Sequence, residues 1–161
     1  MKRVIAALLV TFSGAALGGC GFQPVYAPVN GQLADGGLIE VATIRGRPGH
    51  MLRQALLQEL ALGVPGLTES VTLTVDLNDK LSRLAFQPDG AASRSSVLAT
   101  GKYSLKGESV SVRGVVDVET GFLVPDSPFG DIAAQTSASD RAMRMLAKEI
   151  ADDIRLQFAT R

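Results

Sequence analysis

Apolar and polar side chains alternate along three stretches of the chain, 71–78, 97–105 and 110–118. A period of two is typical of β-strands that bury one face, because successive side chains point to opposite sides of a strand. The first alternation runs on towards Phe86, and the Pro-Asp-Gly sequence at 88–90 is typical of a turn. The second and third are separated by a short glycine-containing link, which predicts a β-hairpin.

Two other segments repeat apolar residues at helical spacing. The first, over 52–60, follows a break at 45–49 (Arg-Gly-Arg-Pro-Gly) and ends at the glycines and proline of 63–66. The second carries an apolar stripe over 143–158, with charged residues on its other sides. This helix is expected after Pro125 and Pro128, and Ser139 or Ser137 is expected to cap its core portion.

A short β-rich run at 38–44 precedes the first helix, so the predicted order of elements is β-α-β-β-β-α. Each strand has one apolar face and each helix has one apolar stripe. These patterns predict an α+β fold, a two-layer sandwich with both helices on one face of a four-stranded mixed sheet. The first two strands are expected to run parallel, because a helix connects them. The other sheet face is polar, and it either stays in solvent or meets a partner.

The N-terminus has the layout of a secretory signal. Lys2 and Arg3 precede an apolar stretch at 4–17, and small residues then lead to Cys20. A stretch of about 14 residues is too short to span a bilayer, which needs about 20. The alternatives are an ordinary signal peptide with a chance cysteine, or a short anchor helix.

The ending Leu-Gly-Gly-Cys20 resembles the lipobox of bacterial lipoproteins. That resemblance implies cleavage before Cys20, a diacylglyceryl group on its sulfur and a palmitoyl group on its new amine. Three acyl chains hold a protein stably to a membrane, whereas one chain binds only marginally. Gly21 stands where an aspartate would retain an enteric lipoprotein in the inner membrane, so the implied destination is the outer membrane. The expected organisation is a signal peptide at 1–19, a lipidated tether at 20–37 and a single domain at 38–161.

Candidate catalytic groups are few. His50 is the only histidine and Cys20 the only cysteine, so no internal disulfide can form and metal ligands are scarce. Asp152 and Asp153 are adjacent on a predicted helix and therefore point in different directions. We expect no enzyme, no metal site and no cofactor beyond the lipid, although a lipid-anchored hydrolase remains an alternative.

Charge gives a weaker signal about partners. Removing residues 1–19 leaves a net charge of about −2, which gives no support for a nucleic-acid partner. Several basic residues nevertheless lie on or near the predicted strands: Arg83, Arg94, Lys102, Lys106 and Arg113. Of these, Lys102, Lys106 and Arg113 stand at the polar positions of the alternating pattern. They are interpreted either as a solvated sheet face or as a patch that binds phosphate or carboxylate groups.

Four segments together resemble one family. The mature start, Cys-Gly-Phe-Gln-Pro-Val-Tyr at 20–26, is similar to that of the LPS-assembly lipoprotein family, LptE. The stretch 47–60 resembles its first helix. Segments 127–134 and 140–150 are similar to the C-terminal helix of α-proteobacterial members. The likeness covers nearly the whole mature chain in the same order.

Resemblance to this family implies a β-α-β-β-β-α sandwich anchored on the periplasmic side of the outer membrane. It also implies a plug inside the LptD β-barrel, which binds lipopolysaccharide and acts in its transport to the cell surface. The positions through which enteric members contact lipopolysaccharide do not map onto this chain. An alternative from another class is a lipid-anchored periplasmic adaptor or pilotin for another envelope complex.

We predict that Cys20→Ala leaves an uncleaved or mislocalised precursor, because the modified thiol is gone. Membrane fractionation and the mass of the mature chain measure this. If the variant has the normal processed size and fractionates with the outer membrane, the lipoprotein interpretation is wrong.

Overall fold

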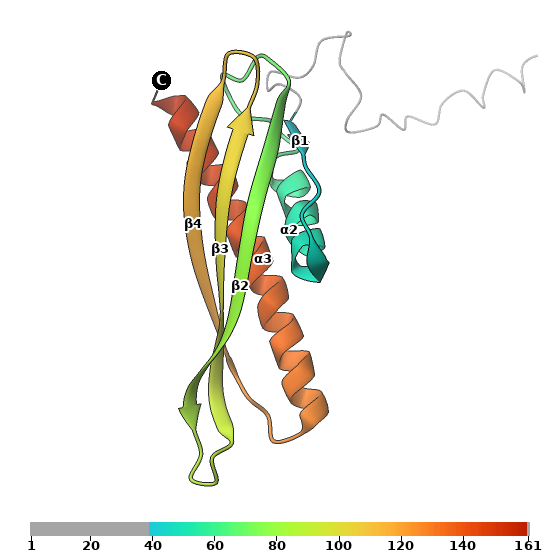
Figure 1. The fold of residues 1–161 in the computed structure, drawn as a ribbon, viewed down its shortest axis with the longest axis vertical. Coiled ribbons are helices and arrows are strands. Elements are labelled where there is room, and N and C mark those ends of the chain that lie inside the picture. The colour runs from blue at the N-terminus through green and yellow to red at the C-terminus, as the bar shows by residue number, and fades with distance from the viewer. Residues whose placement is uncertain (1–38, 161) are drawn as a thin grey trace, which may run out of the picture. The chain divides into compact units, whose positions relative to one another are not determined.

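The computed structural model describes residues 39–160 (Figure 1). The predictions for the signal peptide at 1–19, for Cys20 and for the tether at 20–37 lie outside these residues. The described elements follow the predicted order: β1 (Ile39–Val41), α2 (Gly46–Glu59), β2 (Val71–Phe86), β3 (Ala92–Lys106), β4 (Ser111–Leu123) and α3 (Pro128–Ala159). The predicted α+β class is therefore confirmed.

The four strands form one sheet in the order β1-β2-β3-β4. β1 runs parallel to β2, with Ile39 opposite Val71, which confirms the predicted parallel pair. β2, β3 and β4 are antiparallel neighbours and are much longer than β1. The sheet therefore consists mainly of a three-stranded meander, with β1 as a short edge strand.

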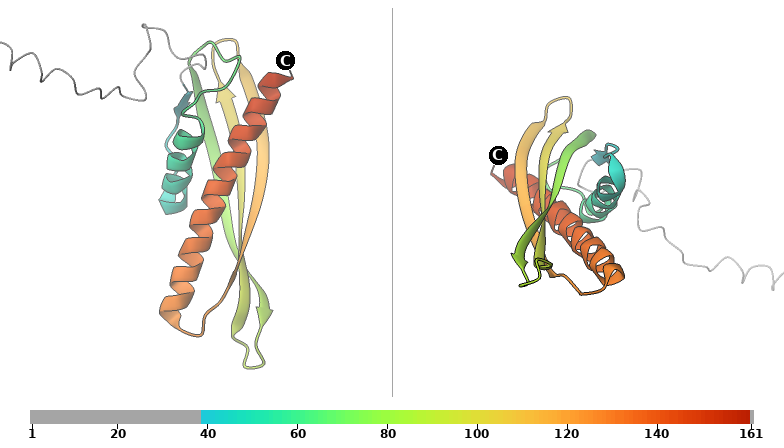
Figure 2. Two further views of the ribbon diagram at one scale, coloured as in Figure 1. Left: turned by 180° about the vertical axis from the view of Figure 1, so that it is seen from behind. Right: turned by 60° about the horizontal axis from the view of Figure 1, so that its bottom comes forward.

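Both helices cover the same face of the sheet (Figure 2). α3 packs along β3 and β4, and α2 packs beside it against α3 and β1. Leu146 and Ile150 of α3 pack directly on Gly101 of β3. A Cβ atom there would lie 3.1 Å from Cδ1 of Ile150 and 3.3 Å from a methyl group of Leu146. A side chain at this position would require these methyl groups to shift.

Tyr103, two residues after Gly101 on the same face of β3, adds a polar link between the sheet and α3. Its ring is buried against Gly114 of β4, where a Cβ atom would clash with it. The phenol hydroxyl donates to Oδ2 of Asp153 at 2.5 Å and accepts from Nε2 of Gln157 at 2.9 Å. Burial raises the pKa of Tyr103, and the Asp153 carboxylate raises it further, so the phenol stays protonated and keeps this link.

Asp152 and its neighbour Asp153 contact different partners, as their adjacency predicts. Asp152 lies 2.6 Å from Nζ of Lys148 and 2.9 Å from Nη1 of Arg155 on the same helix. The Lys148 ammonium in particular holds the pKa of Asp152 below its usual value. The two carboxylates therefore serve separate contacts.

The second helix starts close to its predicted position, but the serine predicted to cap its core portion was wrong. α3 begins at Pro128, and Ser127 caps it by accepting a hydrogen bond from the backbone N–H of Gly130 at 3.0 Å. Ser137 and Ser139 lie inside the helix. A serine followed by proline is a strong start signal, because proline fits the first helical position. The apolar stripe does not extend into this first turn of α3, because the side chains of the turn are largely exposed.

The predicted break at 45–49 was also wrong in part. Residues 46–49 form the first turn of α2. Pro48 is tolerated there because the first N–H groups of a helix have no partner within it. The strands are likewise longer than the alternation indicated, since β3 begins at Ala92 and β4 continues to Leu123.

We predict that Leu146→Asp or Ile150→Asp unfolds the domain. Both side chains are fully buried where α3 meets the sheet. An unpaired buried carboxylate costs several kcal/mol against a total stability of about 5–15 kcal/mol. Thermal unfolding measures the effect, with the half-exposed Asp152→Ala as a control expected to change little. Equal melting temperatures for all three variants would contradict this assignment of the buried helix face.

Candidate functional site

The sheet face that points away from the helices carries a cluster of basic residues, Lys102, Lys106 and Arg113, here called the basic patch. The strand register places Arg113 of β4 opposite Ser104 of β3. Lys102 and Lys106 are therefore its two diagonal neighbours on the same face, each about 7–8 Å away between backbones. A single phosphate group is small enough to contact two of these three side chains.

Hydroxyl groups surround the basic patch. Lys106 lies between Thr72 and Ser111 in the register, and Ser104 separates the two lysines. Among the residues that pair with Lys102, Ser104 and Lys106 in the strand register, the negatively charged one is Asp76, opposite Lys102. Within residues 39–160, none of the three basic side chains makes an ion pair or a hydrogen bond, and all three are exposed. The hydroxyl oxygen of Ser104 is buried, whereas Thr72 beside Lys106 is exposed. The patch thus offers three exposed cations, a combination that suits a phosphate or carboxylate ligand.

The other two predicted contact residues lie elsewhere. Arg94 shares the outer face but stands at the far end of β3, opposite Leu123. Arg83 lies on the helix-facing side, where its guanidinium donates to Oγ of Ser95 at 3.2 Å and pairs with Asp131 at 3.4 Å. The structure therefore brings together three of the five predicted residues.

His50 lies in the first half of α2 and has no carboxylate partner. Its Nε2 lies 3.1 Å from Nε2 of Gln54, one turn along the same helix. Across residues 39–160, no group of three potential metal ligands lies together. None of the helices in this range is both long and apolar enough to cross a membrane.

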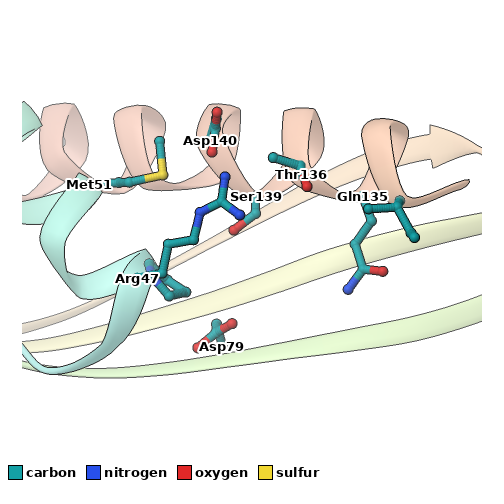
Figure 3. Close-up of a pocket in the computed structure, with 9 residues that line it drawn as sticks. Arg47, Met51, Asp79, Gln135, Thr136, Ser139 and Asp140 are labelled. Carbon is teal, nitrogen blue, oxygen red and sulfur yellow. The ribbon is translucent and has the colours of Figure 1, made fainter. Parts of the chain in front are cut away.

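A cleft of about 270 Å³ lies where the start of α2 meets the middle of α3 (Figure 3). Arg47 extends from α2 towards α3, and Asp79 of β2 and Asp140 of α3 also line the cleft. The nearby carboxylates disfavour an anionic ligand. No sequence pattern predicted this cleft, because its walls come from α2, β2 and α3, which are distant in sequence.

The fold is shared with solved structures of lipoproteins. A protein of Caulobacter crescentus CB15, provisionally described as a lipoprotein, matches with a TM-score of 0.62 at 25% identity, covering 76% of this chain and 92% of that chain. Rare lipoprotein B of Shewanella oneidensis matches with a TM-score of 0.51 at 11% identity, covering 77% of this chain and 93% of that chain. A minor lipoprotein of Acinetobacter baumannii matches with a TM-score of 0.53 at 10% identity, covering 77% of this chain and 94% of that chain.

Sequence comparison alone finds less. No family model matches the chain, and no curated protein matches it. The matches below 25% identity show the fold alone. Together with the Caulobacter protein, they are consistent with a lipoprotein, as the lipobox-like sequence at Cys20 predicts.

Proposed function

We propose that this chain is an outer-membrane lipoprotein of the LPS-assembly type, which plugs the LptD β-barrel and binds lipopolysaccharide during its transport to the cell surface. The supporting observation is a coincidence of two independent features. A lipobox-like sequence ends at Cys20, and the domain that follows has a fold found in lipoproteins along almost their full length. The protein acts by binding and assembly and makes or breaks no covalent bond.

A plug needs a rigid body with a polar surface, because the lumen of a large membrane barrel is itself polar. The long meander and α3 supply the rigid body, and the outer sheet face supplies much of the polar surface. The lipid on Cys20 keeps the domain at the membrane and so raises its effective concentration near the barrel.

The basic patch has the chemistry that binding of lipopolysaccharide requires. Lipopolysaccharide carries phosphate groups, and the patch presents three exposed cations that form no ion pair with any of residues 39–160. Charge-assisted hydrogen bonds to such groups each contribute about 1.5–3 kcal/mol. Binding through this face would leave the helix-covered core undisturbed.

The proposed partnership is tested by co-purification in detergent. We expect the full-length lipidated chain to bring down a barrel of much larger mass, identified by mass spectrometry as LptD. Recovery of a different envelope complex, such as a secretion system, would favour the adaptor or pilotin alternative and contradict the proposal.

Lipopolysaccharide binding is tested with Lys102→Ala/Arg113→Ala. Losing two charge-assisted contacts is expected to weaken binding roughly a hundredfold. The melting temperature should not change, because both side chains are exposed and make no hydrogen bond or ion pair within residues 39–160.

The matched control is Lys80→Ala/Arg144→Ala, which removes the same charge from exposed positions outside the patch. Equal binding by wild type and by both double variants would mean that the basic patch is ordinary solvated surface.

A further inference from the structure

Exposed apolar side chains gather at the end of the domain that carries the β2–β3 hairpin. They come from β2, β4 and α3, and their exposed fractions range from 40% to 87%. This surface, here called the hairpin-end surface, comprises Leu81, Leu84, Phe86, Leu123, Phe129 and Ile132. The β2–β3 turn and the start of α3 lie at the same end of the domain (Figures 1 and 2). Concentrated exposed apolar area of this kind marks an interaction site.

The β2–β3 hairpin projects a short way beyond β4. Pairing between β3 and β4 ends at Arg94 and Leu123, and beyond this point β2 and β3 continue as a short two-stranded ribbon that consists of the pair Phe86–Ala92 and the turn. The backbone N–H of Val124 donates to the carbonyl oxygen of Ser93 at 3.0 Å and ties this ribbon to the connection from β4 to α3. A register shift between Arg83 and Ala85 leaves Leu84 without a cross-strand partner. Irregularities of this kind redirect side chains, and here an exposed leucine is the result.

A wide cleft of about 730 Å³ opens between this ribbon and the connection from β4 to α3. Phe86 and Val124 give it apolar walls, and Asp89 and Asp126 lie at its rim. Arg83 is already paired with Asp131. The two remaining carboxylates accept only a backbone N–H, for Asp89, and a glutamine amide, for Asp126. They are therefore available to a cation.

The charges at this end decide between two kinds of occupant. Three aspartates (Asp89, Asp126 and Asp131) stand against two arginines (Arg83 and Arg94). An anionic lipid surface attracts basic segments and is not attracted by an acidic one. A protein surface that combines apolar side chains with a lysine or arginine has the complementary chemistry.

We propose that the hairpin-end surface docks onto the protein partner, with Leu84, Phe86 and Phe129 as apolar anchors and with Asp89 and Asp126 receiving a basic side chain. This inference rests on the proposed function, in which the partner is the LptD barrel. The basic patch lies on the outer face towards the β3–β4 turn, at the other end of β3, so the two surfaces can be occupied together.

Co-purification of the full lipidated chain with the barrel tests the surface. Leu84→Ser/Phe129→Ser and, separately, Asp89→Asn/Asp126→Asn should each weaken barrel binding about tenfold or more, as expected for interface anchors. Melting temperature and lipopolysaccharide binding should stay at the wild-type values. Asparagine also preserves the turn that Asp89 stabilises through the N–H of Ala91 at 2.9 Å.

The control is Leu62→Ser/Leu156→Ser, which removes two leucines that are 93% and 62% exposed outside this surface. If the wild type recovers no barrel, the proposed function fails. If the wild type recovers the barrel and both test variants match the control, the proposed function stands and the docking surface is wrong.

A photo-reactive residue at position 129, with position 62 as the control, identifies the occupant in living cells. Cross-linking of position 129 alone to the barrel, identified by mass spectrometry, supports the proposal. Cross-linking of position 129 to lipopolysaccharide or phospholipid, or equal cross-linking at both positions, overturns it.

Discussion

The contact between α3 and β3 at Gly101 is the constraint on which the rest of the structure depends. Because Gly101 has no side chain, Leu146 and Ile150 reach the backbone of the sheet, and the fully buried stripe of α3 lies along β3 and β4. The Tyr103 hydroxyl then fixes the helix to the sheet through Asp153. The helix thus determines which face of the pleat is buried, and the alternation of each strand sends every other side chain to the opposite face.

The two candidate surfaces follow from this arrangement, and their chemistry differs. Near the β3–β4 turn, the outer face presents Lys102, Lys106 and Arg113 among hydroxyl groups. At the other end of the same strands, leucine and phenylalanine side chains of β2, β4 and α3 are exposed near aspartates. One surface is suited to phosphate groups and the other to a protein. The role proposed above, in which the domain binds a lipid ligand while docked to a barrel, requires two such separate surfaces.

The sequence predicts those features that depend on local periodicity. The alternation of β2 and the stripe around Leu146 predicted the sandwich, and the same parity placed the basic patch on the outer face. Arg83 has the parity of the buried residue Leu73, which already indicates the helix-facing side. The clefts and the register shift at Leu84 had no local signal, because they arise where distant elements meet. The prolines at 125 and 128 located the start of α3, but the cap was assigned to a later serine because the apolar stripe begins further along, where the helix becomes buried.

The first turns of α3 contribute little to the core. The fully buried residues of this helix begin at Ala138, whereas Phe129 and Ile132 remain 87% and 65% exposed. Exposing such side chains favours aggregation, and removing them would cost the fold little. Stability of the domain therefore does not explain why a phenylalanine and an isoleucine stand there. A docked partner does explain them, because the same side chains become favourable once a protein surface removes them from water. From Ala138 onwards α3 packs against the rest of the fold, and the proposed docking surface uses the exposed turns that precede it.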